Sequence, residues 1–196
     1  MSLSLRQRLG IAAVLALVML ATRINHFTPV PDASWALFFA GGFYLRGLGR
    51  WAFPAFMALA VAIDAWVITA GGQSFFDHYC MSAAYWFLVP SYAAMWFGGL
   101  LLARNYRGLQ WRAVAWVAAT LLVSASACYL LSNGSFYWLS DTVTNATFGG
   151  WAKNLGDWYL PYLRSTAMYV AGGAVVHVVV ALLARERVAA ADAVAR

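Results

Sequence analysis

The sequence predicts an all-α integral membrane protein with six transmembrane helices, and three observations support this fold class. The mean hydropathy of the 196 residues is +0.68, and 63% of them are hydrophobic while only 10% are charged. The apolar residues form continuous stretches of about the 20 residues that a helix needs to cross a bilayer. These stretches lack the period-two alternation of β-barrel strands. Helices, which satisfy their backbone hydrogen bonds internally, are therefore expected.

The second of these stretches is short. Trp35 to Arg46 is 12 residues, about 18 Å of helix, so the membrane is thinned there or the outer end stops below the surface. In the second case residues 28–34, which contain Pro29 and Pro31, would floor an outward-facing cavity. We expect one domain covering residues 1–196, with spans at about 9–24, 33–47, 51–70, 81–103, 113–131 and 164–184.

The basic residues predict the orientation of the six spans. An even number of spans places both termini on one side, and ten of the 13 Lys and Arg residues fall on that side. Both termini are therefore expected to be cytoplasmic. The net charge of +6 is explained by this placement, so no nucleic-acid partner is expected. The ten are Arg6, Arg8, Arg46, Arg50, Arg104, Arg107, Arg112, Arg185, Arg187 and Arg196, against Arg23, Lys153 and Arg164.

The outer connections are richer in functional groups than the cytoplasmic ones. Residues 23–34, 71–80 and 132–163 contain aromatic, amide, hydroxyl and carboxylate side chains, which a simple connector does not need. The last of these is expected to form short interfacial helices that cover the bundle as a lid, with Gly149, Gly150 and Gly156 as helix breakers. An aromatic belt at the headgroup level is the alternative interpretation of this segment.

Cys80 is the most reactive side chain predicted at the outer face. It follows Asp77, His78 and Tyr79 and precedes the fourth span. As a thiolate it would be a strong ligand for a transition metal and also a nucleophile. Two alternatives remain open, namely an inert small residue and a disulfide with Cys128, which otherwise packs as an apolar residue.

Two polar residues inside the spans call for partners. Asp64 is the one carboxylate within a span, so it should face a cavity, pair with a cation such as Arg23, or be protonated. His177 lies in the middle of the last span, where an interhelical hydrogen bond is expected. A zinc site built from His26, His78 and Cys80 lacks the usual ligand spacing.

Small residues predict where helices approach closely. Ala12 and Ala16 form a small-xxx-small pattern in the first span. Gly41 with Gly42 and Gly98 with Gly99 allow similar approaches in the second and fourth spans.

The segments RINHFTPVPDASWALFFAGGFYLR and DHYCMSAAYWFLVPSYAAMWFG resemble the BtuM group of small vitamin B12 transporters. The six short spans and substrate-like outer loops resemble more generally the S-components of energy-coupling-factor transporters. The resemblance implies a solitary S-component-like bundle in the bacterial cytoplasmic membrane, with cobalamin as the transported substrate in an outward-facing cavity.

The resemblance also implies roles for individual residues. Cys80 would take an axial position on cobalt, displacing the dimethylbenzimidazole base or an upper ligand such as cyanide, so ligand-stripping chemistry would accompany uptake. Other residues would bind the corrin, the apolar ones covering its faces. They are Asn25, His26, Thr28, Asp64, Asp77, His78 and Tyr85 for the polar edge, and Phe27, Trp66, Phe76 and Tyr79 for the faces.

Other functions remain open. An energy-coupling-factor ATPase module would dock on the Ala12 and Ala16 face, although proteins of this group are thought able to act without it. The chain has no Walker motif of its own. The alternatives to cobalamin uptake are an S-component for another vitamin or metal chelate, and a membrane enzyme with Cys80 as nucleophile and His78 or His26 as base.

Overall fold

The computed structural model describes residues 3–24 and 31–194, with side chains up to Glu186. The described residues form helices and contain no strand. In chain order the elements are α1 (Leu5–Arg23), α2 (Ser34–Tyr44), α3 (Gly49–Ala70), the 3-10 helix η1 (Ala83–Phe87), α4 (Leu88–Asn105), α5 (Trp111–Leu139) and α6 (Phe148–Val194).

The helices confirm the all-α membrane character. Five described segments are long and apolar enough to cross a membrane: α1, α3, η1 with α4, α5, and α6 up to Glu186. Their surfaces carry many exposed leucine, valine and tryptophan side chains, as lipid-facing helices require. The chain is thus an all-helical bundle of the multi-pass membrane type.

α2 is too short to be the sixth such helix. Its 11 residues extend about 16 Å, roughly half the hydrocarbon thickness of about 30 Å. Most of its side chains are buried, and it contacts α1, α3, α4 and α6. The short second element is therefore confirmed, and it lies inside the bundle.

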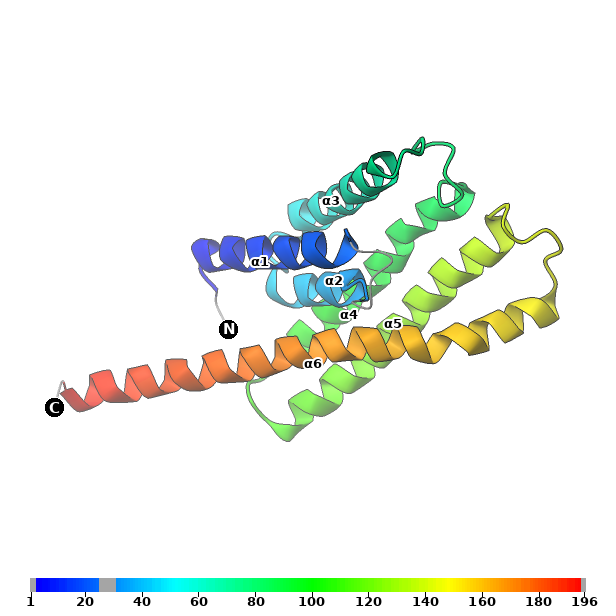
Figure 1. Ribbon diagram of the computed structural model, residues 1–196. Helices are drawn as coiled ribbons and strands as arrows, with labels where there is room; N and C mark the ends of the chain where they lie inside the picture. The colour runs from blue at the N-terminus through cyan, green and yellow to red at the C-terminus, as the bar shows by residue number, and fades with distance from the viewer. Residues whose placement is uncertain (1–2, 25–30, 195–196) are drawn as a thin grey trace.

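Successive helices run in alternating directions along the bundle (Figure 1). The two termini, the connection 45–48 and the connection 106–110 lie toward one end, and the connections 71–82 and 140–147 lie toward the other. The basic connections are therefore grouped with the termini. We call the end with residues 71–82 the loop end and the opposite one the terminal end.

The predicted lid over residues 132–163 is wrong. α5 continues to Leu139 and α6 begins at Phe148, so residues 140–147 alone connect the two helices. The reason is tertiary packing, which overrides the glycines expected to break the helix. Ser126 Oγ lies 2.8 Å from Tyr159 Oη, and the Tyr129 hydroxyl donates a 2.9 Å hydrogen bond to the carbonyl of Leu155.

Glycines bring α2 and α4 into close contact, as the sequence predicted. A Cβ atom on Gly42 would overlap the backbone carbonyl of Trp96, and one on Gly99 would overlap the backbone carbonyl of Phe39. The two backbones therefore approach closely at a reciprocal pair of glycines, which allows them dense van der Waals packing.

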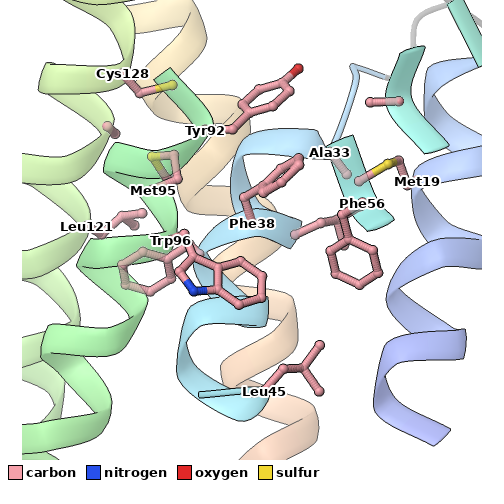
Figure 2. Close-up of a cluster of buried hydrophobic side chains, with 14 of the residues drawn as sticks. Met19, Ala33, Phe38, Leu45, Phe56, Tyr92, Met95, Trp96, Leu121 and Cys128 are labelled. Carbon is pink, nitrogen blue, oxygen red and sulfur yellow. The ribbon is translucent and has the colours of Figure 1, made fainter. Parts of the chain in front are cut away.

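The buried core surrounds this crossing (Figure 2). The Phe38 ring of α2 stacks on Tyr92 at 4.4 Å between centroids and meets Phe56 edge-on. Cys128 of α5 is fully buried in the same cluster, and both it and Cys80 are free thiols. The structure thus contains no Cys80–Cys128 disulfide, and the prediction that Cys128 packs as an apolar residue is confirmed.

The prediction for His177 is also confirmed. Its Nδ1 lies 2.8 Å from the hydroxyl of Tyr44 in α2, and its Nε2 lies 2.7 Å from the hydroxyl of Tyr106, which follows α4. These contacts tie α6 to the terminal end of the bundle. Ala12 and Ala16 of α1 are half-buried and pack against the core.

Candidate functional site

A buried arginine organises the ends of four elements near the loop end. Arg23 in the last turn of α1 is 4% exposed. Its Nε and Nη2 donate to the two carboxylate oxygens of Asp64 in α3 at 2.7 and 2.6 Å. Its Nη1 donates to Asp32 at 2.8 Å, to Ser34 of α2 at 3.1 Å and to Tyr92 of α4 at 2.9 Å. The guanidinium therefore joins α1, α2, α3 and α4.

The surrounding groups complete this network. Asp32 accepts the backbone N–H of Ser34 at 2.9 Å and so satisfies a donor at the start of α2. The Tyr85 hydroxyl of η1 donates to Asp64 at 2.8 Å. Because a bidentate arginine–carboxylate pair has a rigid geometry, these contacts fix the position of η1 and of the loop before it.

Cys80 lies on that loop and is half-buried. Its backbone N–H donates to His78 Nδ1 at 3.3 Å, and its thiol is hydrogen-bonded to the hydroxyl of Tyr79. Since Nδ1 of His78 is occupied by the backbone, this imidazole nitrogen is not aligned to deprotonate the thiol. A general base at His78 would therefore have to act through Nε2.

The surroundings of Cys80 set its proton affinity. Burial raises the pKa of the thiol above its ordinary value, the hydrogen bond with Tyr79 lowers it, the charge of Asp64 raises it and that of Arg23 lowers it. The net direction is upward. The unliganded sulfur is therefore largely protonated at neutral pH. The influence of both Arg23 and Asp64 places the thiol within electrostatic range of the buried network.

We expect the alkylation rate of Cys80 by iodoacetamide to rise about tenfold per pH unit from about pH 7, without a plateau below about pH 8.5. The thiolate is the reactive form, and a raised pKa moves the plateau to higher pH. Mass spectrometry of the labelled peptide in a Cys128→Ala background measures this rate. A plateau below about pH 8 would contradict the raised pKa.

The structure brings together only part of the predicted set. Asp64 and Tyr85 meet in the Arg23 network, so the pairing of Asp64 with Arg23 is confirmed as one of the three alternatives for this carboxylate. Asp77 is exposed and His78 half-buried, beside Cys80. The predicted residues Asn25, His26, Phe27 and Thr28 lie outside the described residues.

The apolar members of the predicted set are exposed. Phe76 is 82% exposed, and Trp66 and Tyr79 are each 56% exposed. Each therefore offers an apolar face near the loop end, either to lipid or to a ligand.

No family model matches the chain, and no curated protein matches it. The function of the site is therefore inferred from its own residues and their geometry.

The described residues contain no group of three or more His, Cys, Asp or Glu side chains that could hold a metal ion. A free divalent cation bound by a protein cage is therefore not the ligand that the described side chains suit. A single thiol, by contrast, suits a metal that already carries most of its ligands.

Two cavities stand out in the described part of the chain, and Cys80 lines neither. One, of about 240 Å³, lies between α5 and α6 and is lined by Asn133, Phe136, Tyr137, Val143, Asn154, Trp158 and Tyr162. Asn133 and Asn154 fall in the segment predicted to form a lid and were not among the predicted site residues. Asn133 Oδ1 is buried and has no hydrogen-bond partner among the described residues. The other cavity lies at the terminal end.

Proposed function

We propose that this chain takes up cobalamin and related corrinoids across the cytoplasmic membrane of a bacterium, with the sulfur of Cys80 as an axial ligand of cobalt. The observation that carries the proposal is the setting of Cys80. It is a free, half-buried thiol on a loop at the end of an apolar helical bundle, within range of a buried arginine–carboxylate network. The resemblance of the segments around Arg23 and Cys80 to the BtuM group supports the same function.

Ligand chemistry explains why one cysteine is enough. The corrin ring supplies four nitrogen ligands to cobalt, so the protein has only an axial position to fill. A cobalt–sulfur bond forms as the bond to the dimethylbenzimidazole base or to the upper ligand breaks, and the thiol proton leaves with the displaced group or to solvent. Tyr79, hydrogen-bonded to the thiol, is placed to stabilise the thiolate before the metal binds.

The corrin would lie on the surface of the loop end, because Cys80 lines neither of the two cavities described above. Phe76, Tyr79 and Trp66 would cover its apolar faces. The amides at its edge would be bound by Asp77, His78, Asn25, His26 and Thr28, while Phe27 would join the residues that cover the faces. Asp64 and Tyr85 would hold the Cys80 loop in position from inside the bundle, as parts of the Arg23 network.

The proposal also includes the orientation of the chain in the membrane and an ATPase module as its partner. With the terminal end in the cytoplasm, as the distribution of basic residues predicts, the loop end faces outward and receives the substrate. An energy-coupling-factor ATPase module would be an optional partner at α1.

A spectroscopic experiment tests cobalt ligation. Protein purified from cells given cobalamin is expected to retain the corrinoid and to show a visible spectrum shifted by a sulfur axial ligand. Cys80→Ala and Cys80→Ser are expected to lose this shift, because neither side chain offers a thiolate to cobalt. Cys128→Ala is the matched control, since it removes the other sulfur and is expected to leave the spectrum unchanged.

An unaltered spectrum in Cys80→Ala would reject the cobalt–sulfur bond. Uptake is measured separately, as growth of a bacterium that depends on external cobalamin and has no other transporter for it. Conversion of a substrate that stays outside the cell, without accumulation within, would favour the membrane-enzyme alternative.

A further inference from the structure

The cavity at the terminal end has a basic lining. It has a volume of about 210 Å³ and is lined by Leu3, Arg8, Phe43, Tyr44, Arg46, Ala103, Arg104 and Tyr106. Its three arginines come from different elements: Arg8 from the start of α1, Arg46 from the α2–α3 connection, and Arg104 from the last turn of α4. The cavity is therefore formed only when these elements pack together.

Arg8 is held at this cavity although one of its buried donors, Nε, has no acceptor among the described residues. A Cβ atom on Gly47 would overlap the Arg8 guanidinium, so the glycine lets this group lie directly against the α2–α3 connection. A buried guanidinium donor without an acceptor is costly, which indicates that an acceptor from outside the chain completes the site.

The described residues that line the cavity include three arginines and no acidic side chain. Arg46 Nη1 donates a 3.3 Å hydrogen bond to the carbonyl of Ala103. The hydroxyls of Tyr44 and Tyr106 are both engaged by His177. The arginines are therefore the available donors, and they favour an anion.

We propose that this cavity binds a phosphate group. Planar guanidinium groups recognise phosphate oxygens through paired hydrogen bonds, which a single lysine cannot reproduce. The volume is below the about 300–1,000 Å³ of pockets for drug-sized ligands, so it suits a single phosphate or phosphodiester group.

The cavity lies at the ends of the apolar helices, where the headgroup of a phospholipid would also lie. Arg8 lies in the first turn of α1 and Arg104 in the last turn of α4. Basic pockets between helices at this depth meet the headgroups of anionic lipids. A lipid phosphodiester and free inorganic phosphate offer the same chemistry, and the experiment separates the two sources.

The full-length protein is titrated in detergent micelles with phosphatidylglycerol, with phosphatidylcholine and with inorganic phosphate, and its thermal stability is followed. Native mass spectrometry counts the lipids retained. We expect Arg8→Gln and Arg104→Gln each to weaken phosphatidylglycerol binding by about tenfold or more. The matched control is Arg6→Gln on the exposed side of the same helix, with an expected change of less than about twofold. Arg104 is exposed, so its variant tests the site even if Arg8→Gln folds poorly.

Protection by phosphatidylglycerol alone, lost in the two variants, supports the cavity as a lipid site. Protection by inorganic phosphate as well, lost in the same variants, supports it as a general phosphate site. Equal protection by phosphatidylcholine that survives both substitutions would overturn the proposal. Equal weakening by Arg6→Gln would also overturn it, because the effect would then come from overall charge.

Discussion

Arg23→Met is expected to lower the free energy of unfolding by about 3–5 kcal/mol. The substitution keeps most of the side-chain volume but leaves Asp64, which is 5% exposed, buried without its cation. It also removes the donor shared by Asp32, Ser34 and Tyr92. Unfolding in mixed detergent micelles with increasing dodecyl sulfate, followed by circular dichroism, measures the loss.

The double variant Arg23→Met/Asp64→Leu separates charge pairing from packing. If the pair is the cause, the double variant is more stable than the sum of the single losses predicts, by about 2 kcal/mol or more. Lys153→Met is the matched control, because the Lys153–Asp157 pair is exposed and worth about 0.5 kcal/mol or less. Additive losses in the double variant would contradict the assigned role of Arg23.

The second large effect is expected at the glycine crossing of α2 and α4. Gly99→Ala should lower the free energy of unfolding by about 3 kcal/mol, because its Cβ would overlap the backbone carbonyl of Phe39. Backbone atoms cannot rotate away as a side chain can, so the two helices must separate. Gly42→Ala should act in the same way against Trp96.

Gly10→Ala is the matched control for this prediction. Gly10 lies within α1 and a Cβ there would meet nothing within 4 Å, so alanine should be neutral or slightly stabilising through its higher helix propensity. The same detergent unfolding assay compares the three variants. Equal stability of Gly99→Ala and Gly10→Ala would show that the crossing is looser than the structure describes.

Both sets of substitutions are also expected to affect function, because they change the position of the Cys80 loop. The Arg23 network holds η1 through Tyr85 and Asp64, and the glycine crossing holds α4, which follows η1, against α2. On the proposed function, a variant that loosens either one is expected to weaken cobalamin binding while Cys80 stays in place. It would therefore lower affinity while keeping the shifted spectrum at saturation, unlike Cys80→Ala.

Local sequence patterns predicted the parts that depend on composition and spacing. Continuous apolar stretches indicated helices, because a backbone in lipid has to satisfy its own hydrogen bonds. The short stretch after Pro31 indicated a short second helix, and the glycine pairs indicated close approaches in the second and fourth spans without showing that these two helices meet. Asp64 was recognised as a residue that requires a partner, with Arg23 among the choices.

Long-range contacts decided the features that the sequence analysis missed. The segment from Ser132 to Leu163 contains glycines and aromatic residues typical of a loop, yet all of it except residues 140–147 belongs to α5 and α6, because their side chains pack against each other. The convergence of Asp32, Ser34 and Tyr92 on Arg23, and of Tyr85 on Asp64, was not predicted, since these residues are separated along the chain. The basic cavity likewise needs Arg8, Arg46 and Arg104 from three elements.

The helical membrane character and the presence of a thiol on one loop followed from the sequence alone, because hydropathy and the nature of a side chain are properties of residues and their neighbours. The packing of the helices decided that Arg23 pairs with Asp64 and Asp32, and that Arg8, Arg46 and Arg104 line one cavity. Those outcomes depend on distances between helices, which the order of residues along a single chain does not express.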